Sequence, residues 1–245
     1  MFKSDLLEAL SKVHFTVPLF IFVPVIGFCI YKDFELSLGI VLFFEMFFLG
    51  LFVWTLVEYI MHRFVFHYVP EGKDWAMRLH FIFHGVHHDY PSDAKRLVLP
   101  PSVSIPLATG FYFLFNAILP PHYIFGFFPG FILGYLFYDI SHYAIHHFNF
   151  KGKIWKKIKQ HHMLHHYQDP GKGYGVSSPL WDKIFRSDFQ TLVSDWPCAG
   201  NTPPVRRNAR AARPVPSLGV KCKHRFMRNS YLTISENIRL KYWPV

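Results

Sequence analysis

The sequence has 245 residues, of which 51% are hydrophobic and 19% are aromatic, including 28 phenylalanines. This composition is more apolar than that of an average soluble domain, and it favours side chains that face lipid or line a pocket. The net charge of +10 belongs almost wholly to residues 201–245, where ten Lys and Arg accompany one acid. A basic surface for nucleic acid on the rest of the chain is thereby excluded, and we expect no nucleic-acid partner.

Four apolar stretches follow one another along the chain. They cover approximately residues 13–30, 36–60, 103–119 and 123–140, and the last two are joined by the short segment P-P-H at 120–122. About 20 apolar residues span a bilayer as a helix, and shorter ones are tolerated in tight bundles. We therefore predict an all-α integral membrane protein with four transmembrane helices in two hairpins. Buried helices of a soluble protein are the alternative, which the near absence of charge disfavours.

The two hairpins predict the topology of the chain. They place the N-terminus, residues 61–102 and everything after residue 141 on one side of the membrane. That side carries most of the basic residues of the first 200, including the lysine-rich segment 151–159, whereas the connections on the other side carry Lys32 alone. By the positive-inside rule the first side is cytoplasmic. We expect the endoplasmic reticulum membrane in a eukaryote and the inner membrane in a bacterium.

Thirteen of the 16 histidines lie in four short clusters on this predicted cytoplasmic side, at residues 62–67, 80–88, 142–147 and 161–166. Residues three and four apart share a helix face, so each cluster can direct several imidazoles at one point. Neutral imidazole suits iron, copper and zinc, and one tetrahedral ion needs about four ligands. A cytoplasmic helical cap holding two metal ions is therefore predicted. Its proposed ligands are His62, His67, His84, His87, His88, His142, His146, His162, His165 and His166.

Other polar residues near the clusters are predicted to support these ligands. Metal-bound imidazoles usually donate their second N–H to a neighbouring group. The candidates for this orienting or structural role are Glu58, Asp89, Asp139, His80, His147 and His161. For Asp89, a solvated interfacial acid is an equal alternative. No catalytic residue is predicted beyond the metal centre.

Cysteine usage excludes other kinds of metal and redox site. Cys29, Cys198 and Cys222 lie far apart and form no C-x-x-C pair. This pattern argues against an iron–sulfur cluster, a thiolate zinc site and a disulfide framework. The N-terminal residues carry acids and show no cleavable signal pattern.

At the histidine clusters the sequence resembles the fatty acid hydroxylase/sterol desaturase superfamily of membrane di-metal enzymes. The resemblance covers about residues 2–186, and within the superfamily the chain is most similar to fatty acid 2-hydroxylases acting on sphingolipid acyl chains. The family's ligand pattern falls on the same ten histidines. The matching stretches are E-Y-I-M-H-R-F-V-F-H (58–67), H-G-V-H-H (84–88), R-L-V-L-P-P (96–101), G-Y-L-F-Y-D-I-S-H (134–142), H-M-L-H-H-Y (162–167) and G-Y-G-V-S-S-P-L-W-D-K-I-F (173–185).

The resemblance implies a monooxygenase with a di-iron centre, at whose positions zinc can also bind. Such a centre uses O₂ to hydroxylate the acyl chain of a fatty acid or ceramide in the membrane at C2. Eukaryotic relatives often carry a fused cytochrome b5 domain, but this sequence contains neither a haem-binding H-P-G-G segment nor a G-x-G-x-x-G fingerprint. We therefore expect a separate electron donor, such as cytochrome b5 with its reductase, to dock near residues 151–159.

The family pattern stops near Phe185, which predicts a membrane domain over residues 1–190 and a basic, disordered tail over residues 191–245. The tail is interpreted either as a segment that binds anionic lipid or as an aberrant reading frame without function. Alternatives to 2-hydroxylation are another superfamily reaction on a sterol, carotenoid or sphingoid base, a histidine-rich metal transporter, and a purely structural metal site. A transporter would need ligands along a path inside the membrane, whereas these clusters lie at helix ends.

Overall fold

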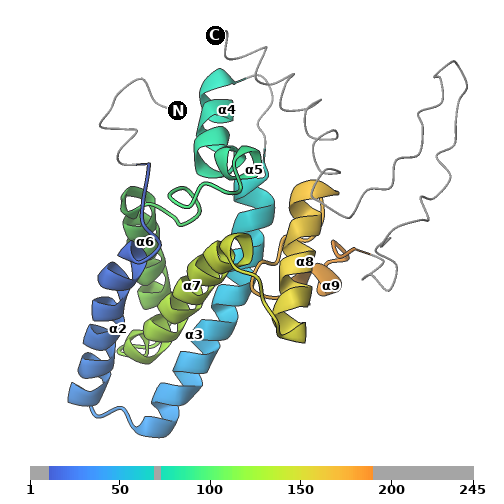
Figure 1. The fold of residues 1–245 in the computed structure, drawn as a ribbon. Helices are drawn as coiled ribbons and strands as arrows, with labels where there is room; N and C mark the ends of the chain where they lie inside the picture. The colour runs from blue at the N-terminus through green and yellow to red at the C-terminus, as the bar shows by residue number, and fades with distance from the viewer. Residues whose placement is uncertain (1–10, 69–72, 190–245) are drawn as a thin grey trace, which may run out of the picture. The chain divides into compact units, whose positions relative to one another are not determined.

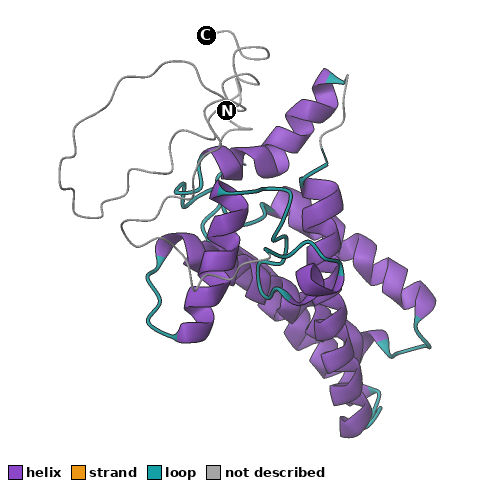
Figure 2. Ribbon diagram, turned by 90° about the vertical axis from the view of Figure 1, so that its right-hand side faces the viewer, coloured by secondary structure: helices purple, strands orange, loops and turns teal. Residues whose placement is uncertain are grey.

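The computed structural model describes residues 11–68 and 73–189, and within them all regular structure is helical (Figure 2). The prediction of an all-α protein is therefore confirmed for the described residues. The elements in chain order are α2 (Val17–Glu35), α3 (Ile40–Ile60), η1 (Met61–Phe66), α4 (Asp74–His80), η2 (Phe81–Gly85), α5 (Val86–Asp89), α6 (Pro101–Ile118), α7 (Ile124–His147), α8 (Lys153–Tyr167) and α9 (Leu180–Ile184). The predicted tail over residues 191–245 lies outside the described residues.

Four helical segments are long and apolar enough to cross a membrane: Val17–Glu35, Ile40–Phe66, Pro101–Ile118 and Ile124–His147. The predicted number of spans is confirmed, but several ends differ from the predicted ones. Residues 36–39 form a turn rather than the start of a helix, with positive φ angles of 52° at Ser37 and 92° at Gly39. The apolar stretch predicted over residues 123–140 belongs to a longer helix that ends at His147, so three of the clustered histidines, His142, His146 and His147, lie on the membrane helix itself.

The two hairpin connections lie at the same end of the helices. The α2–α3 and α6–α7 connections are at the lower end in Figure 1, and α4 and α5 are at the upper end. Lys32 and Leu36 line a surface pocket together with Leu119 and Pro121, which places the two connections beside each other. The histidine-bearing ends of α3 and α7 therefore lie together at the opposite end.

Close packing of α3 against α7 forms the centre of the fold. A Cβ atom added to Gly130 would lie 1.9 Å from the carbonyl oxygen of Phe47, and one added to Gly50 would lie 2.0 Å from that of Phe127. Each helix therefore places a glycine against the backbone of the other. Small residues at such crossings let membrane helices approach closely, and van der Waals contact then stabilises the pair. The position of α7 fixes the histidines at its C-terminal end.

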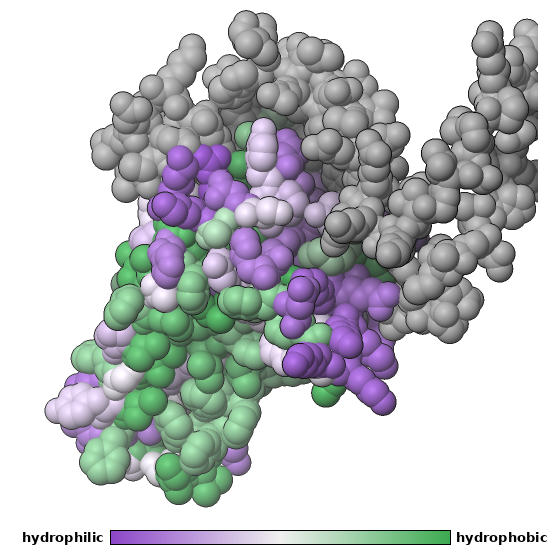
Figure 3. Space-filling view, in the orientation of Figure 1, coloured by the Kyte–Doolittle hydropathy of each residue, from purple (hydrophilic) through white to green (hydrophobic). Residues whose placement is uncertain are grey.

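Large apolar side chains cover the outside of the membrane-spanning helices. Hydrophobic residues dominate the lower part of the view in Figure 3, whereas hydrophilic residues gather at the upper end and over α8. Phe20, Phe34 and Ile40 are among the exposed apolar residues. Such an apolar surface suits lipid contact, which agrees with the interpretation of the phenylalanine-rich composition.

Candidate metal centre

The first pair of histidines comes from a π-helical turn at the end of α3. In η1 the backbone N–H of His67 donates to the carbonyl oxygen of His62 at 3.2 Å, a bond from residue i+5 to residue i. On an α-helix, a spacing of five would separate the two side chains by about 140°. The π turn instead brings their Nε2 atoms to 3.2 Å. π-bulges occur often at functional sites. The H-x₄-H spacing of His62 and His67 is typical of such a turn, whereas the i+3 and i+4 spacings used in the sequence prediction describe only a regular α-helix.

The two H-x-x-H-H motifs lie at residues 84–88 and 162–166. Each contributes its three histidines to two separate spatial groups. In each motif the first and last histidines share a group, with Nε2 atoms 2.9 Å and 3.0 Å apart in the two motifs. The middle histidine, His87 or His165, belongs to the other group. The expectation that each cluster directs its imidazoles at one point is therefore wrong for these motifs. Because each motif serves both groups, the two groups are held next to each other.

The ten histidines named from the sequence form two groups of five, and within each group the ligand nitrogens lie within 4.8 Å of one another. The structure thus brings all ten together, while their role as metal ligands stays a prediction. Group A consists of His62, His67, His84, His88 and His165. Group B consists of His87, His142, His146, His162 and His166.

The spacing of the nitrogen atoms fits one metal ion in each group. Neighbouring Nε2 atoms are 2.9–3.2 Å apart in both groups. With metal–nitrogen bonds of about 2.0–2.1 Å, two ligands at right angles around one ion lie about 2.9 Å apart. A network of histidine–histidine hydrogen bonds is a poorer explanation, because each neutral imidazole has only one N–H to donate.

Groups A and B adjoin each other. The ring centroids of His88 in group A and His166 in group B are 4.3 Å apart. Those of His62 in group A and His162 in group B are 6.5 Å apart. Two ions held by these groups would therefore form one centre rather than two independent sites.

Burial keeps the imidazoles of the cap in the neutral form that binds metal. Burial lowers the pKa of His87, His162 and His166 well below the usual value, and neighbouring histidines lower it further. Burial is also the main reason that the pKa of His165 falls to about 3. Neutral imidazole is the form that coordinates a metal ion. These groups are therefore ready to act as ligands at neutral pH.

Two group A histidines are oriented by backbone carbonyls of the segment 172–177. The Nδ1 atom of His165 donates to the carbonyl oxygen of Lys172 at 2.7 Å, and that of His62 donates to the carbonyl oxygen of Tyr174. Such a bond fixes the tautomer and leaves Nε2 as the ligand atom. Backbone carbonyls thus perform the task that the sequence analysis gave to carboxylates.

The two buried acids predicted to orient imidazoles bind backbone instead. Glu58 accepts the N–H groups of Val176 and Ser177, both at 2.8 Å. Asp139 accepts the N–H of Leu99 at 3.2 Å, and the Tyr135 hydroxyl donates to it at 3.1 Å. Both acids therefore fix loops that lie beside the histidine groups.

The remaining predicted supporting residues have different surroundings. The Nε2 atom of His161 lies 3.1 Å from a carboxylate oxygen of Asp182. The ring of His147 lies 4.6 Å from that of Tyr143. His80 is half-buried in α4, and Asp89 is exposed. Of these four residues, His161 thus has the clearest link to the site, through Asp182.

Asp182 is a site residue that the sequence analysis missed. Its side chain is fully buried. It accepts hydrogen bonds from the N–H groups of Tyr174 and Gly175 at 2.9 and 2.7 Å, from the Ser187 hydroxyl at 2.8 Å and from His161. Burial alone would raise the pKa of Asp182, but these hydrogen bonds outweigh burial and lower it. The sequence did indicate a buried role for Asp182, because the acid lies inside the largely apolar stretch L-W-D-K-I-F (180–185).

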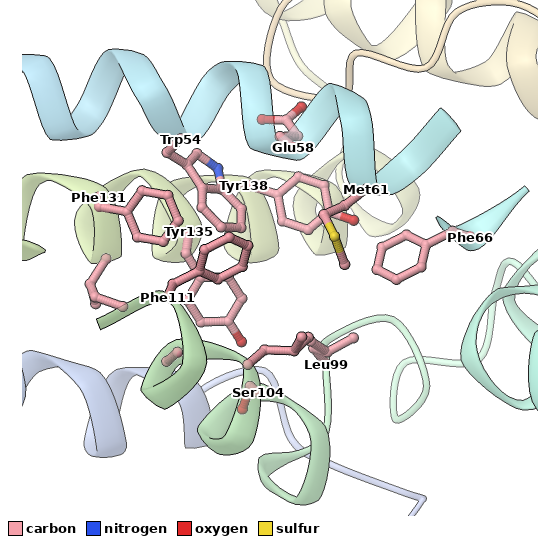
Figure 4. Close-up of a pocket in the computed structure, with 13 residues that line it drawn as sticks. Trp54, Glu58, Met61, Phe66, Leu99, Ser104, Phe111, Phe131, Tyr135 and Tyr138 are labelled. Carbon is pink, nitrogen blue, oxygen red and sulfur yellow. The ribbon is translucent and has the colours of Figure 1, made fainter. Parts of the chain in front are cut away.

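An apolar cavity of about 50 Å³ lies between the membrane-spanning helices, and Figure 4 shows the side chains that line it. Phe111 and Phe131 line it within the membrane-spanning part. Nearer the histidines, Phe66 and Tyr138 line it, with ring centroids 5.4 Å from His84 of group A and 5.7 Å from His142 of group B. The cavity is therefore placed to bring an apolar molecule to the centre.

Comparisons of the sequence and the fold with known proteins all find fatty acid hydroxylases. The family model described as fatty acid hydroxylase matches residues 47–187. A dihydroceramide fatty acyl 2-hydroxylase of Arabidopsis thaliana is 36% identical over 185 residues, covering 75% of this chain and 77% of that protein. A ceramide very long chain fatty acid hydroxylase of Schizosaccharomyces pombe is 40% identical over 191 residues, covering 76% of this chain and 54% of that protein.

A fatty acid 2-hydroxylase of Rattus norvegicus is 36% identical over 209 residues, covering 76% of this chain and 56% of that protein. The chain thus spans about half the length of the fission yeast and rat relatives. Among solved structures, the visible hydroxylase domain of scs7p superposes with a TM-score of 0.73 at 35% identity, covering 77% of this chain and 71% of that one. The matched regions of all these proteins include the histidine-bearing part of the chain.

Proposed function

We propose that this chain, which belongs to the fatty acid hydroxylase family, hydroxylates the acyl chain of a fatty acid or ceramide at C2. The observation that carries the proposal is the pair of histidine groups at the end of an apolar cavity between membrane-spanning helices. The similar proteins include 2-hydroxylases of fatty acids and of dihydroceramide acyl chains, which supports C2 as the position.

Groups A and B would each hold one iron ion, with zinc able to occupy the same positions. Five imidazoles without a thiolate form a donor set that suits either metal. When bound, the iron pair would supply the activation of O₂ needed to attack an unactivated C–H bond. The chain's own contribution is to hold the ligands neutral and oriented and to place the substrate.

The cavity would bind the acyl chain and exclude water from the reacting carbon. Its volume of about 50 Å³ exceeds the roughly 10–15 Å³ that a cavity needs to hold one water molecule, but it holds only a short piece of an acyl chain. Entry of the substrate must therefore displace side chains. Met61 lines the cavity beside His62, and its flexible, unbranched side chain makes it suited to move.

The N-terminal half of α8 is a suitable docking surface for a separate electron carrier such as cytochrome b5. Lys153, Lys156 and Lys157 are exposed. His162 follows Lys157 by five residues, or about 7.5 Å along the helix axis, so a carrier docked there would lie close to the histidine groups. Lys159 contributes less, because its ammonium group donates to the carbonyl oxygen of Phe148 at 2.8 Å. A cytoplasmic orientation, and the endoplasmic reticulum in a eukaryote, would give access to such a carrier.

The proposed function is tested by expressing the protein in cells that lack fatty acid 2-hydroxylase and measuring 2-hydroxylated ceramides by mass spectrometry. The wild-type chain should produce them. His165→Ala in group A and His87→Ala in group B should each abolish the product, because each removes a ligand, while the amount of protein in the membrane stays unchanged. A hydroxylated sterol or sphingoid base instead would contradict C2 hydroxylation, and full product from either variant would contradict the metal assignment.

A further inference from the structure

The segment of residues 172–177, here called the harness loop, contacts group A with its carbonyls and two buried acids with its N–H groups. Its carbonyls at Lys172 and Tyr174 accept hydrogen bonds from the group A histidines His165 and His62. Four successive backbone N–H groups point the other way and donate to carboxylates: those of residues 174 and 175 to Asp182, and those of residues 176 and 177 to Glu58. The loop thus connects two carboxylates to two imidazoles.

The two carboxylates belong to different helices and hold the harness loop from two elements. Glu58 lies in α3 and Asp182 in α9. The carboxylate of Asp182 accepts hydrogen bonds from four donors, which matches the roughly four lone-pair positions of a carboxylate. Gly175 allows this close approach, since an added Cβ would lie 2.1 Å from the carbonyl oxygen of Ser178 and 2.9 Å from Asp182. The position of the loop is therefore tightly determined.

No hydrogen bond from the harness loop reaches a group B histidine in the part of the chain that the structure describes; His142 of group B instead bonds the backbone of Leu97, next to the Leu99 N–H that Asp139 accepts. The Nδ1 atoms of His87, His162 and His166 are buried and have no hydrogen-bond partner among the described residues. Their rings are positioned by the helices that carry them. The protein thus fixes the imidazoles of the two groups by different means.

We propose that Glu58 and Asp182 are positioning residues that act through the harness loop on group A alone, making the two metal positions unequal. The inference rests on the proposed function in one respect, that groups A and B each bind an ion. Removal of a group that orients a metal-bound histidine typically lowers metal affinity by about 10–100-fold. Loosening the harness loop should therefore lower the affinity of group A for its ion by this factor and leave the affinity of group B for its ion unchanged.

The experiment follows release of Zn²⁺ from the purified full chain, loaded with Zn²⁺ in detergent, after addition of an excess of chelator. His88→Ala and His166→Ala, each lacking one ligand of group A or group B, identify which ion leaves in which phase. Asp182→Asn should speed release of the group A ion by about 10–100-fold, because asparagine has one acceptor oxygen and turns an amide N–H toward backbone donors. The group B phase should keep its wild-type rate.

Two further variants keep the test decisive. Asp139→Asn is the matched control: it also changes a buried acid that accepts a backbone N–H, but it should leave the rate of the group A phase unchanged. Ser177→Ala removes only the hydroxyl that donates to Glu58, so it should fold even if Asp182→Asn does not, and it should speed the group A phase by a smaller factor.

The outcomes separate this inference from the proposed function. Two ions in the wild-type chain, with only the group A phase accelerated in Asp182→Asn and Ser177→Ala, would support the harness loop. If the wild-type chain binds two ions but the variants accelerate both release phases, or neither, the inference would be overturned and the proposed function would stand. Fewer than two ions in the wild-type chain would contradict the proposed function and the inference together.

Discussion

The two ends of α3 and α7 are stabilised by different interactions. In the membrane-spanning part, the two helices meet through glycines and aromatic rings, and the interaction is close van der Waals packing. At the histidine end, the described contacts are hydrogen bonds and imidazole clusters that join segments far apart in the sequence, such as His62 and Tyr174. The same two helices therefore contain a part that depends on close packing and a part that depends on polar interactions, and each part can be disrupted by its own substitutions.

The largest expected effect on stability comes from disrupting the close packing of α3 against α7 in the membrane-spanning part. Gly130→Ala would place a Cβ 1.9 Å from a backbone carbonyl oxygen of α3, so the two helices must move apart at a cost of about 3 kcal/mol, the upper end of what overpacking typically costs. We expect a strongly lowered melting temperature of the purified protein and loss of metal from both groups. Gly110→Ala is the matched control, since an added Cβ there meets nothing within 4 Å. Equal melting temperatures for the two variants would contradict the importance of this crossing.

A smaller effect is expected at the polar end, on α8. Changing Lys153, Lys156 and Lys157 to Glu should lower turnover with cytochrome b5 and its reductase by about tenfold at low salt, because charge complementarity speeds association. The difference should shrink as salt is added, since the Debye length is about 10 Å at 0.1 M. Lys32→Gln, at the opposite end of the helices, should have little effect. Turnover that is indifferent to both the triple change and salt would contradict docking on α8.

The smallest effect is expected from the basic C-terminal segment. Residues 201–245 lie outside the region matched by the family model, and their removal should leave the yield in membranes and the amount of 2-hydroxylated lipid unchanged. A loss of product at equal protein yield would show that this segment binds lipid or the electron donor. The result would also show whether residues 1–200 suffice for the reaction.

The sequence predicted those features that depend on composition and local spacing. The four spans followed from the exclusion of charge from apolar stretches, and the ten proposed ligands stood out among thirteen clustered histidines through repeated spacings at the ends of the apolar stretches. The close approach of α3 to α7 at Gly130 was not predicted, because it depends on which helix faces which.

The arrangement within the histidine end could not be predicted by the same reasoning. The division of each H-x-x-H-H motif between groups A and B depends on which other histidines each side of the helix meets, and that is set by the packing of segments far apart in the sequence. The harness loop joins Glu58 to Ser177 and His62 to Tyr174 across 119 and 112 residues. Asp182 was overlooked because two of its four hydrogen-bond partners are backbone N–H groups, which leave no pattern of side-chain types in a sequence.

The most direct test of the central claim is a count of metal ions in the purified protein, combined with X-ray absorption to identify the ligand atoms. We predict two ions per chain, with nitrogen ligands at about 2.0–2.1 Å and no sulfur ligand. His88→Ala and His166→Ala should each reduce the count toward one, because the first disrupts group A and the second group B. A single ion in the wild-type chain, a sulfur ligand, or two firmly held ions in both variants would contradict the account.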